Sequence, residues 1–255
     1  MPSAKAAFAG TNEQFIANLA HQLRYPLVPI RNAAALLKQE APDAVTIHRV
    51  ADIIERQTNS MQRLIGDLVD VSRLEMGALP LHRTHASLMG LIDHAVGFCE
   101  ALANERGHTL SVSVASTPVQ LLVDLPRLSQ ALRHIIENAC RYANPHGHIC
   151  IRAQQDGPCA VITVSDTGDG IAATESEKIF ALFERSEHVR RAEQGLGIGL
   201  YLARHFIEAH GGTVNVASRG LGCGSVFTAK IPCEAANAPR LEDASAVTAI
   251  GPSRA

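Results

Sequence analysis

The sequence predicts an α+β protein in which an antiparallel hairpin of two long helices precedes an α/β domain. Apolar residues recur at three- and four-residue steps over residues 15–37 and again over residues 47–71, which is the spacing of two amphipathic helices. From residue 88 onward, helical stretches alternate with short strand-like runs. A chain of 255 residues is long enough for two modest domains.

The first predicted domain, residues 11–78, is the helical hairpin. The stretch T-N-E-Q at residues 11–14 forms a capping box, and a break at residues 41–43 separates the two helices. In the second helix the apolar positions alternate strictly between three- and four-residue steps, as in a coiled coil. Two antiparallel helices bury little surface alone, so we expect two copies to form a dimeric four-helix bundle. Residues 1–10 are small and polar, and we expect them to be disordered.

The second predicted domain, residues 79–233, contains the α/β elements. Helices are expected over residues 88–99, 128–143 and 196–209. Strands are expected over residues 109–115 and 119–123, which alternate like a pair, and over residues 148–153, 160–165, 213–217 and 225–231. The tail, residues 234–255, is rich in Ala, Pro and Ser, and disorder is expected there.

Composition narrows the possible partners. A net charge of −2 argues against nucleic-acid binding, and no apolar run has the length of a membrane span. The six cysteines contain no C-x-x-C pair, and the N-terminus does not resemble a signal peptide. We therefore expect reduced thiols in a cytoplasmic protein, whose sensing part is either missing from this sequence or lies on a separate protein.

Two glycine clusters bracket a polar loop in the second domain. V-S-D-T-G-D-G-I places Asp166, Gly168 and Gly170 directly after a strand-like run, and G-L-G-I-G-L follows at residues 195–200. Glycine tolerates positive φ and lets backbone N–H groups approach an anion, so a phosphate cradle is one interpretation and two ordinary turns are the other. Neither cluster has the Rossmann or P-loop spacing, so a nucleotide bound here requires another fold.

The order of these motifs resembles a known family. Asn138 lies on a predicted helix upstream of the first glycine cluster, and Phe180 and Phe183 lie between the two clusters. This series resembles the N, G1, F and G2 boxes of sensor histidine kinases. The resemblance implies a left-handed α/β sandwich of the Bergerat type, shared with gyrase-type and chaperone ATPases.

The same resemblance implies ATP and Mg²⁺ as cofactors. It makes Asn138 the magnesium ligand and Asp166 the acceptor for the adenine amino group, although a helix cap and a turn carboxylate are the plain alternatives. His134 stands where the family often has Asn. The other residues that the resemblance places around the base and phosphates are Arg141, Tyr142, Gly168, Gly170, Phe180, Phe183, Gly195, Gly197, Gly199 and Leu200.

Residues 15–27, F-I-A-N-L-A-H-Q-L-R-Y-P-L, resemble the H box of the same family. The resemblance makes His21 the phospho-acceptor, with Gln22 and Arg24 beside it; the alternative for a lone histidine is a solvated surface residue. The family usually has Glu or Asp where this chain has Gln22. An amide can accept a hydrogen bond from the imidazole but cannot act as a base, so we expect slow autophosphorylation.

These observations predict an ATP-dependent protein-histidine kinase. It would form a homodimer through residues 11–78, phosphorylate His21 and pass the phosphoryl group to an aspartate of a response-regulator receiver domain. A nucleotide-binding pseudokinase or dimeric scaffold is an alternative, because of Gln22, and a gyrase- or chaperone-type ATPase is another. His146, His148 and Cys150 share one side of a predicted strand and are a further candidate metal group.

Overall fold

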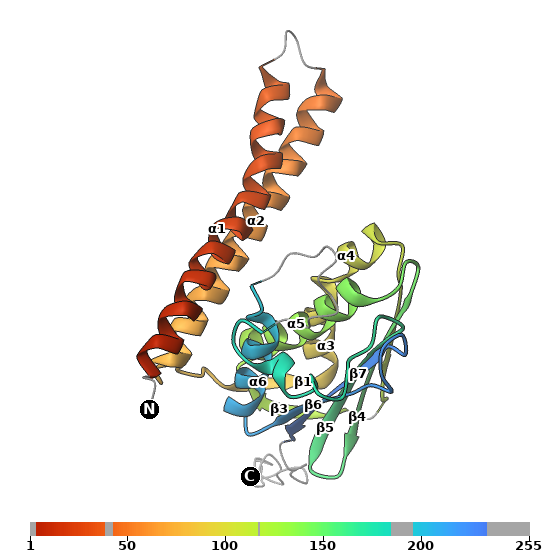
Figure 1. The fold of residues 1–255 in the computed structure, drawn as a ribbon. Helices are drawn as coiled ribbons and strands as arrows, with labels where there is room; N and C mark the ends of the chain where they lie inside the picture. Colours follow the sequence, from red (N-terminus) through yellow and green to blue (C-terminus); the bar gives the residue numbers. More distant parts are fainter. Residues whose placement is uncertain (1–3, 39–42, 117, 185–195, 234–255) are drawn as a thin grey trace, which may run out of the picture.

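The computed structural model describes residues 4–38, 43–116, 118–184 and 196–233. Its first part is the hairpin of α1 (Ala4–Leu37) and α2 (Ala44–Glu75), which projects well beyond the rest of the molecule (Figure 1). α1 includes residues 4–10, ahead of the start expected at Thr11; four of these seven residues are alanine, the best helix former. α2 begins where the Asp43 side chain accepts a 2.7 Å hydrogen bond from the Thr46 N–H.

The α/β domain contains two sheets. A two-stranded antiparallel sheet pairs β1 (Thr84–Ser87) with β3 (Gln120–Val123). The larger sheet has five strands in the order β2-β4-β5-β7-β6, in which only the β2–β4 pair is parallel. Its strands are β2 (Thr109–Val114), β4 (His148–Asp156), β5 (Cys159–Asp166), β6 (Thr213–Ala217) and β7 (Ser225–Pro232).

Helices cover one face of the larger sheet (Figure 1). They are α3 (Leu88–Gly97), α5 (Leu125–Tyr142) and α6 (Gly199–Ala209), with the short α4 (Glu100–Glu105) before β2 and a 3-10 turn, η1 (Lys178–Phe180), before α6. Alternate residues of β5 and β7 are buried beneath the helices, as period-two strands require. The α+β class and the helical hairpin followed by an α/β domain are confirmed.

One predicted strand pairing is wrong. The runs at residues 109–115 and 119–123 form strands β2 and β3, but β2 pairs with β4 and β3 pairs with β1. Alternation of apolar and polar residues identifies a strand and its buried face, but it carries no information about the neighbouring strand. β1 has only four residues, two of them exposed, and the sequence analysis did not predict it.

α5 connects the core to the candidate site. Its residues Leu128, Leu132 and Ile136 point into the core and are completely or almost completely buried, as the helical spacing predicted. The side of α5 that carries Asn138 faces the hairpin instead. Within the described ranges, no helix is both long enough and apolar enough to cross a bilayer.

Candidate functional site

A cavity of about 620 Å³ lies between the hairpin and the α/β domain. Its walls come from α1 and α2 on one side and from α5, the end of β5 and the start of α6 on the other. The predicted site residues that line it are Gln22, Asn138, Arg141, Tyr142, Asp166, Gly170, Gly197, Gly199 and Leu200. The fold thus brings most of the predicted residues together.

Asp166 is the most firmly held of these residues. Its side chain is buried at the end of β5, where Oδ1 accepts a 2.9 Å hydrogen bond from the Gly168 N–H and Oδ2 a 2.5 Å bond from the Ser225 hydroxyl. Burial raises the pKa of Asp166, although these hydrogen bonds oppose the rise. The result is a fixed acceptor at the cavity wall, suited to an exocyclic amine.

Sequence reasoning missed Ser225. The register of β5 and β7 sets Ser225 opposite Asp166, and its backbone N–H lies 3.3 Å from Oδ1 as well. The two residues are 59 positions apart, so only the strand pairing reveals the contact.

Gly168 fits where no other residue can. A Cβ there would lie 2.0 Å from the Tyr142 carbonyl oxygen, because the turn after β5 packs directly against the end of α5. The Asp169 N–H donates to the same carbonyl at 3.0 Å. This contact positions Arg141 and Tyr142 at the cavity, although Gly168 does not itself line it.

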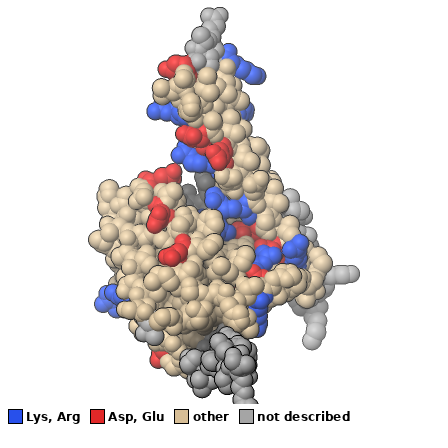
Figure 2. All heavy atoms as spheres, turned by 180° about the vertical axis from the view of Figure 1, so that it is seen from behind, with Lys and Arg blue, Asp and Glu red and all other residues tan. Residues whose placement is uncertain are grey.

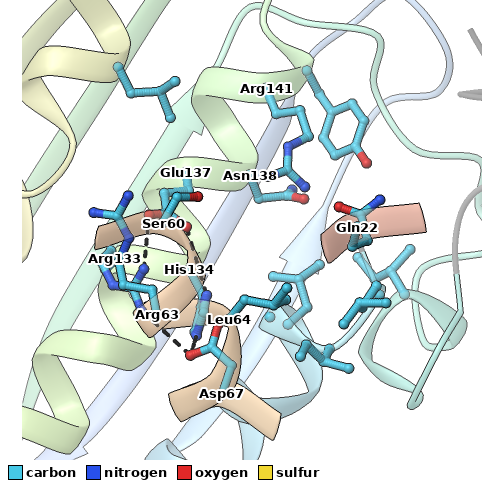
Figure 3. Close-up of a pocket in the computed structure, with 18 of the residues that line it drawn as sticks. Gln22, Ser60, Arg63, Leu64, Asp67, Arg133, His134, Glu137, Asn138 and Arg141 are labelled. Carbon is cyan, nitrogen blue, oxygen red and sulfur yellow. Dashed lines mark hydrogen bonds and ion pairs between the residues drawn. The ribbon is translucent and has the colours of Figure 1, made fainter. Parts of the chain in front are cut away.

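Asn138 and Arg141 project from α5 into the cavity (Figure 3). Both are partly buried, and neither side chain makes a hydrogen bond or ion pair with another described residue. No group of three or more His, Cys, Asp and Glu side chains in the described ranges could hold a metal ion, and this includes the candidate group at residues 146–150. A cation here would need oxygen ligands from its substrate or from water, as Mg²⁺ commonly has.

The two predicted phenylalanines do not line the cavity. Phe180 is buried in the core, where its ring meets the Phe227 ring edge-on at 6.2 Å between centroids. Phe183 adopts φ 67°, which is rare for a residue with a side chain, and its N–H donates to the Gly197 carbonyl at 3.0 Å. Phe183 therefore supports the wall around Gly197, whereas Phe180 belongs to the core. Gly195 lies outside the described residues.

His21 is exposed on α1, as predicted, and its ring contacts the Tyr25 ring edge-on at 4.7 Å. His21 and Arg24 do not line the cavity, whereas Gln22 does (Figure 3). Successive helical residues point about 100° apart, so the face of α1 turned to the cavity is that of Gln22.

The hairpin contacts the α/β domain through two carboxylates of α2, Asp67 and Asp70, which we call the docking pair. Asp67 Oδ1 accepts a 2.9 Å hydrogen bond from Gln130 Nε2 and lies 3.3 Å from His134 Nε2 and 3.6 Å from Arg133 Nη2. Burial alone would raise the pKa of Asp67, yet these neighbours hold it below its ordinary value.

Asp70, the other member of the docking pair, forms a hydrogen-bonded ion pair with Arg127 at the start of α5. Seen from behind, basic and acidic side chains gather where the hairpin meets the α/β domain (Figure 2). The sequence analysis assigned no role to the docking pair, since charged residues on a helix are usually solvated. Their opposing residues lie 57 or more positions further along the chain.

Known proteins match both parts of the chain. The family described as His Kinase A (phospho-acceptor) domain matches residues 11–77, and the family of histidine kinase-, DNA gyrase B- and HSP90-like ATPases matches residues 123–235. Hybrid signal transduction histidine kinase D of Dictyostelium discoideum is 32% identical over 86% of this chain and 14% of its own length. Sensor histidine kinase ZraS of Escherichia coli is 30% identical over 85% of this chain and 44% of its own length.

Solved structures match the fold as well. The crystal structure of full-length ShkA in complex with AMPPNP superposes with a TM-score of 0.63 at 28% identity, covering 89% of this chain and 47% of that one. The chain spans less than half the length of the curated relatives described above.

Proposed function

This chain belongs to the sensor histidine kinases of two-component systems, and we propose that it is an ATP-dependent protein-histidine kinase that phosphorylates its own His21. One observation carries this proposal: the cavity that holds Asp166, Asn138 and Arg141 is closed on its other side by the helices of the phospho-acceptor hairpin. The nucleotide wall and the acceptor helix thus belong to one site.

Different residues of that site would bind the base, bind the phosphates and attack the terminal phosphate. Asp166 would accept a hydrogen bond from the adenine amino group, which fixes the position of the base. Arg141 would hold phosphate oxygens by charge-assisted hydrogen bonds. His21 does not line the cavity in this arrangement, so the transfer requires a movement of the hairpin relative to the nucleotide or a nucleotide held by the second copy. A ring nitrogen of His21 would then attack the γ-phosphorus, forming a P–N bond while the bond to the oxygen bridging to ADP breaks. Positioning and charge neutralisation supply most of the catalysis in such transfers.

Asn138 fits a Mg²⁺ ion that is bound mainly through the substrate. Its side-chain amide carries a hard oxygen and makes no hydrogen bond to another described residue, so that oxygen is available to a cation. When bound, the ion would neutralise phosphate charge. The chain supplies the Asn138 amide and a cavity wall that orients the phosphates.

Because residue 22 is Gln and not an acidic residue, we expect slow autophosphorylation of His21. The amide faces the cavity but cannot take the imidazole proton, which must pass to solvent instead. General-base assistance typically contributes about 10²- to 10⁴-fold, so Gln22→Glu should accelerate autophosphorylation by about tenfold or more.

We further propose that the kinase works as a homodimer through residues 11–78 and passes its phosphoryl group to an aspartate of a response-regulator receiver domain. A separate sensor protein as a partner and a cytoplasmic location stay predictions. The match to the phospho-acceptor family and the exposed apolar residues of the hairpin support the dimer.

Labelling with γ-³²P-ATP and Mg²⁺ tests this function. We expect label that survives base and is lost in acid, as phosphohistidine is, and a faster initial rate for Gln22→Glu. ATP binding without such label, in both the wild type and Gln22→Glu, would instead indicate the pseudokinase or scaffold. Steady ATP hydrolysis without label would indicate an ATPase.

A further inference from the structure

The α2 wall of the cavity carries a polar stripe that the proposed chemistry leaves unused. Gln57, Ser60 and Arg63 follow one another at three-residue steps and all line the cavity. Figure 3 shows Ser60 and Arg63 on α2 together with the α5 residues Glu137 and Asn138. This stripe lies on the hairpin, outside the motifs that identify the nucleotide site.

Arg63 carries a positive charge that no described residue balances. It makes no ion pair or hydrogen bond with any residue in the described ranges. Arg133, which also lines the cavity, is neutralised by Glu137 Oε1 at 3.0 Å and by Asp67 Oδ1 at 3.6 Å. Arg63 and Arg141 therefore remain as the described cations of the cavity that are available to an anion.

The docking pair holds Arg63 in this position. Asp67 lies one turn after Arg63 on the same side of α2 and contacts Gln130, Arg133 and His134 of α5. These contacts fix α2 against α5, and the two helices run in opposite directions there. Arg63, one turn before Asp67 on α2, therefore faces the Glu137–Arg141 stretch of α5. Arg63 is exposed, so its guanidinium can reach a ligand without losing a partner.

We propose that Arg63 of the hairpin binds the terminal phosphate of ATP and is a substrate-contacting residue of the kinase. The inference rests on the proposed function, because the base would lie at Asp166 and the terminal phosphate must face the hairpin that carries His21. Arg141 would hold the phosphates from the α/β domain while Arg63 holds the last one from α2. ATP would then favour the docked arrangement, and ADP would favour it less.

Equilibrium binding of Mg-AMPPNP and Mg-ADP to the full chain tests this assignment. We expect Arg63→Gln to weaken AMPPNP binding about tenfold, the usual scale for losing one charge-assisted hydrogen bond, and ADP binding less than about threefold. Arg63→Lys should restore part of the AMPPNP affinity. Arg73→Gln is the matched control, since Arg73 is on the same helix but does not line this cavity.

Equal losses for both nucleotides, or no loss for either, would overturn the role of Arg63. The thermal unfolding midpoint of Arg63→Gln should match that of the wild type, because the side chain is exposed. The test is separate from the kinase proposal: absence of phosphohistidine in the wild type contradicts the proposed function, while the AMPPNP-to-ADP affinity ratio still reports on Arg63.

Discussion

The hairpin and the α/β domain bury their apolar residues in different ways. The α/β domain has a continuous core that runs through α3, α5, α6 and the sheet. In the described part of the hairpin, the buried hydrophobic residues are Ala33, Val50 and Val71, while many others stay exposed: Leu27, Val28, Leu36, Leu37, Ile47, Ile65 and Val69. The domain therefore completes its own fold, whereas the hairpin leaves apolar surface exposed that a second copy would cover in the proposed dimer.

The largest expected effect concerns the tight packing of the α/β domain. Gly168→Ala would place a Cβ 2.0 Å from the Tyr142 carbonyl oxygen and 2.8 Å from Asp166 Oδ1, and the Tyr142 backbone cannot move aside as a flexible side chain could. We expect a loss of about 3 kcal/mol or more in the free energy of unfolding, at the upper end for overpacking. Chemical denaturation with separate probes for the two regions measures this loss, and an unchanged midpoint for the α/β domain would contradict it.

The exposed surface of the hairpin gives the next effect. Ile65 is 52% exposed on α2, and Ile65→Lys should weaken the dimer by about 2 kcal/mol, or roughly 30-fold in dissociation constant, if the side chain is buried between copies. Analytical ultracentrifugation over a dilution series measures the constant. Met89→Lys is the control, because Met89 is similarly exposed, at 48%, on the α/β domain. An equal effect of both substitutions would remove the contrast between the regions.

The docking pair should make the contact between the regions sensitive to acid. The pKa of Asp67 is lowered in the folded protein, so its stabilisation is complete above the ordinary value of 3.8 and is lost as the pH falls through the lowered value. Asp67→Asn should cost about 1–2 kcal/mol near pH 7. Unfolding measured from pH 7 to pH 2.5 should show the two proteins converging only below about pH 4. A constant difference over this whole range would show that the Asp67 charge is not responsible.

The smallest effect is expected within α2. Gly66 has no heavy atom within 4 Å of the position of an added Cβ, in contrast to Gly168. Gly66→Ala should therefore stabilise the hairpin by about 0.5–1 kcal/mol, the helix-propensity difference. Thermal unfolding of the hairpin at fixed protein concentration measures this gain. A destabilised variant would indicate that another chain packs against Gly66.

Local patterns predicted most of the fold. Apolar residues at three- and four-residue steps identified α2 and α5, and period-two runs identified β4, β5, β6 and β7. The same patterns could not assign partners, so β2 and β3 were paired wrongly and the short β1 and α4 were missed. Such elements depend on contacts with distant segments, and their own residues carry weak periodicity.

The site residues also differ in whether local sequence patterns could predict them. Asp166, Asn138 and Arg141 were predicted from motifs that are local in sequence, and they line one cavity. Ser225 and Arg63 were not predicted, because the first depends on strand register and the second on how α2 docks against α5. Phe180 shows the converse, since it belongs to a recognised motif yet lies in the core.

The central claim is that the α/β domain holds the nucleotide while the hairpin holds the phosphoryl acceptor. The most direct test measures ATP affinity and acid-labile label on the same preparations of wild type, His21→Ala and Asp166→Ala. We expect His21→Ala to bind ATP with wild-type affinity and carry no label, and Asp166→Ala to lose both binding and label. Acid-labile label on His21→Ala would place the acceptor elsewhere and contradict the account.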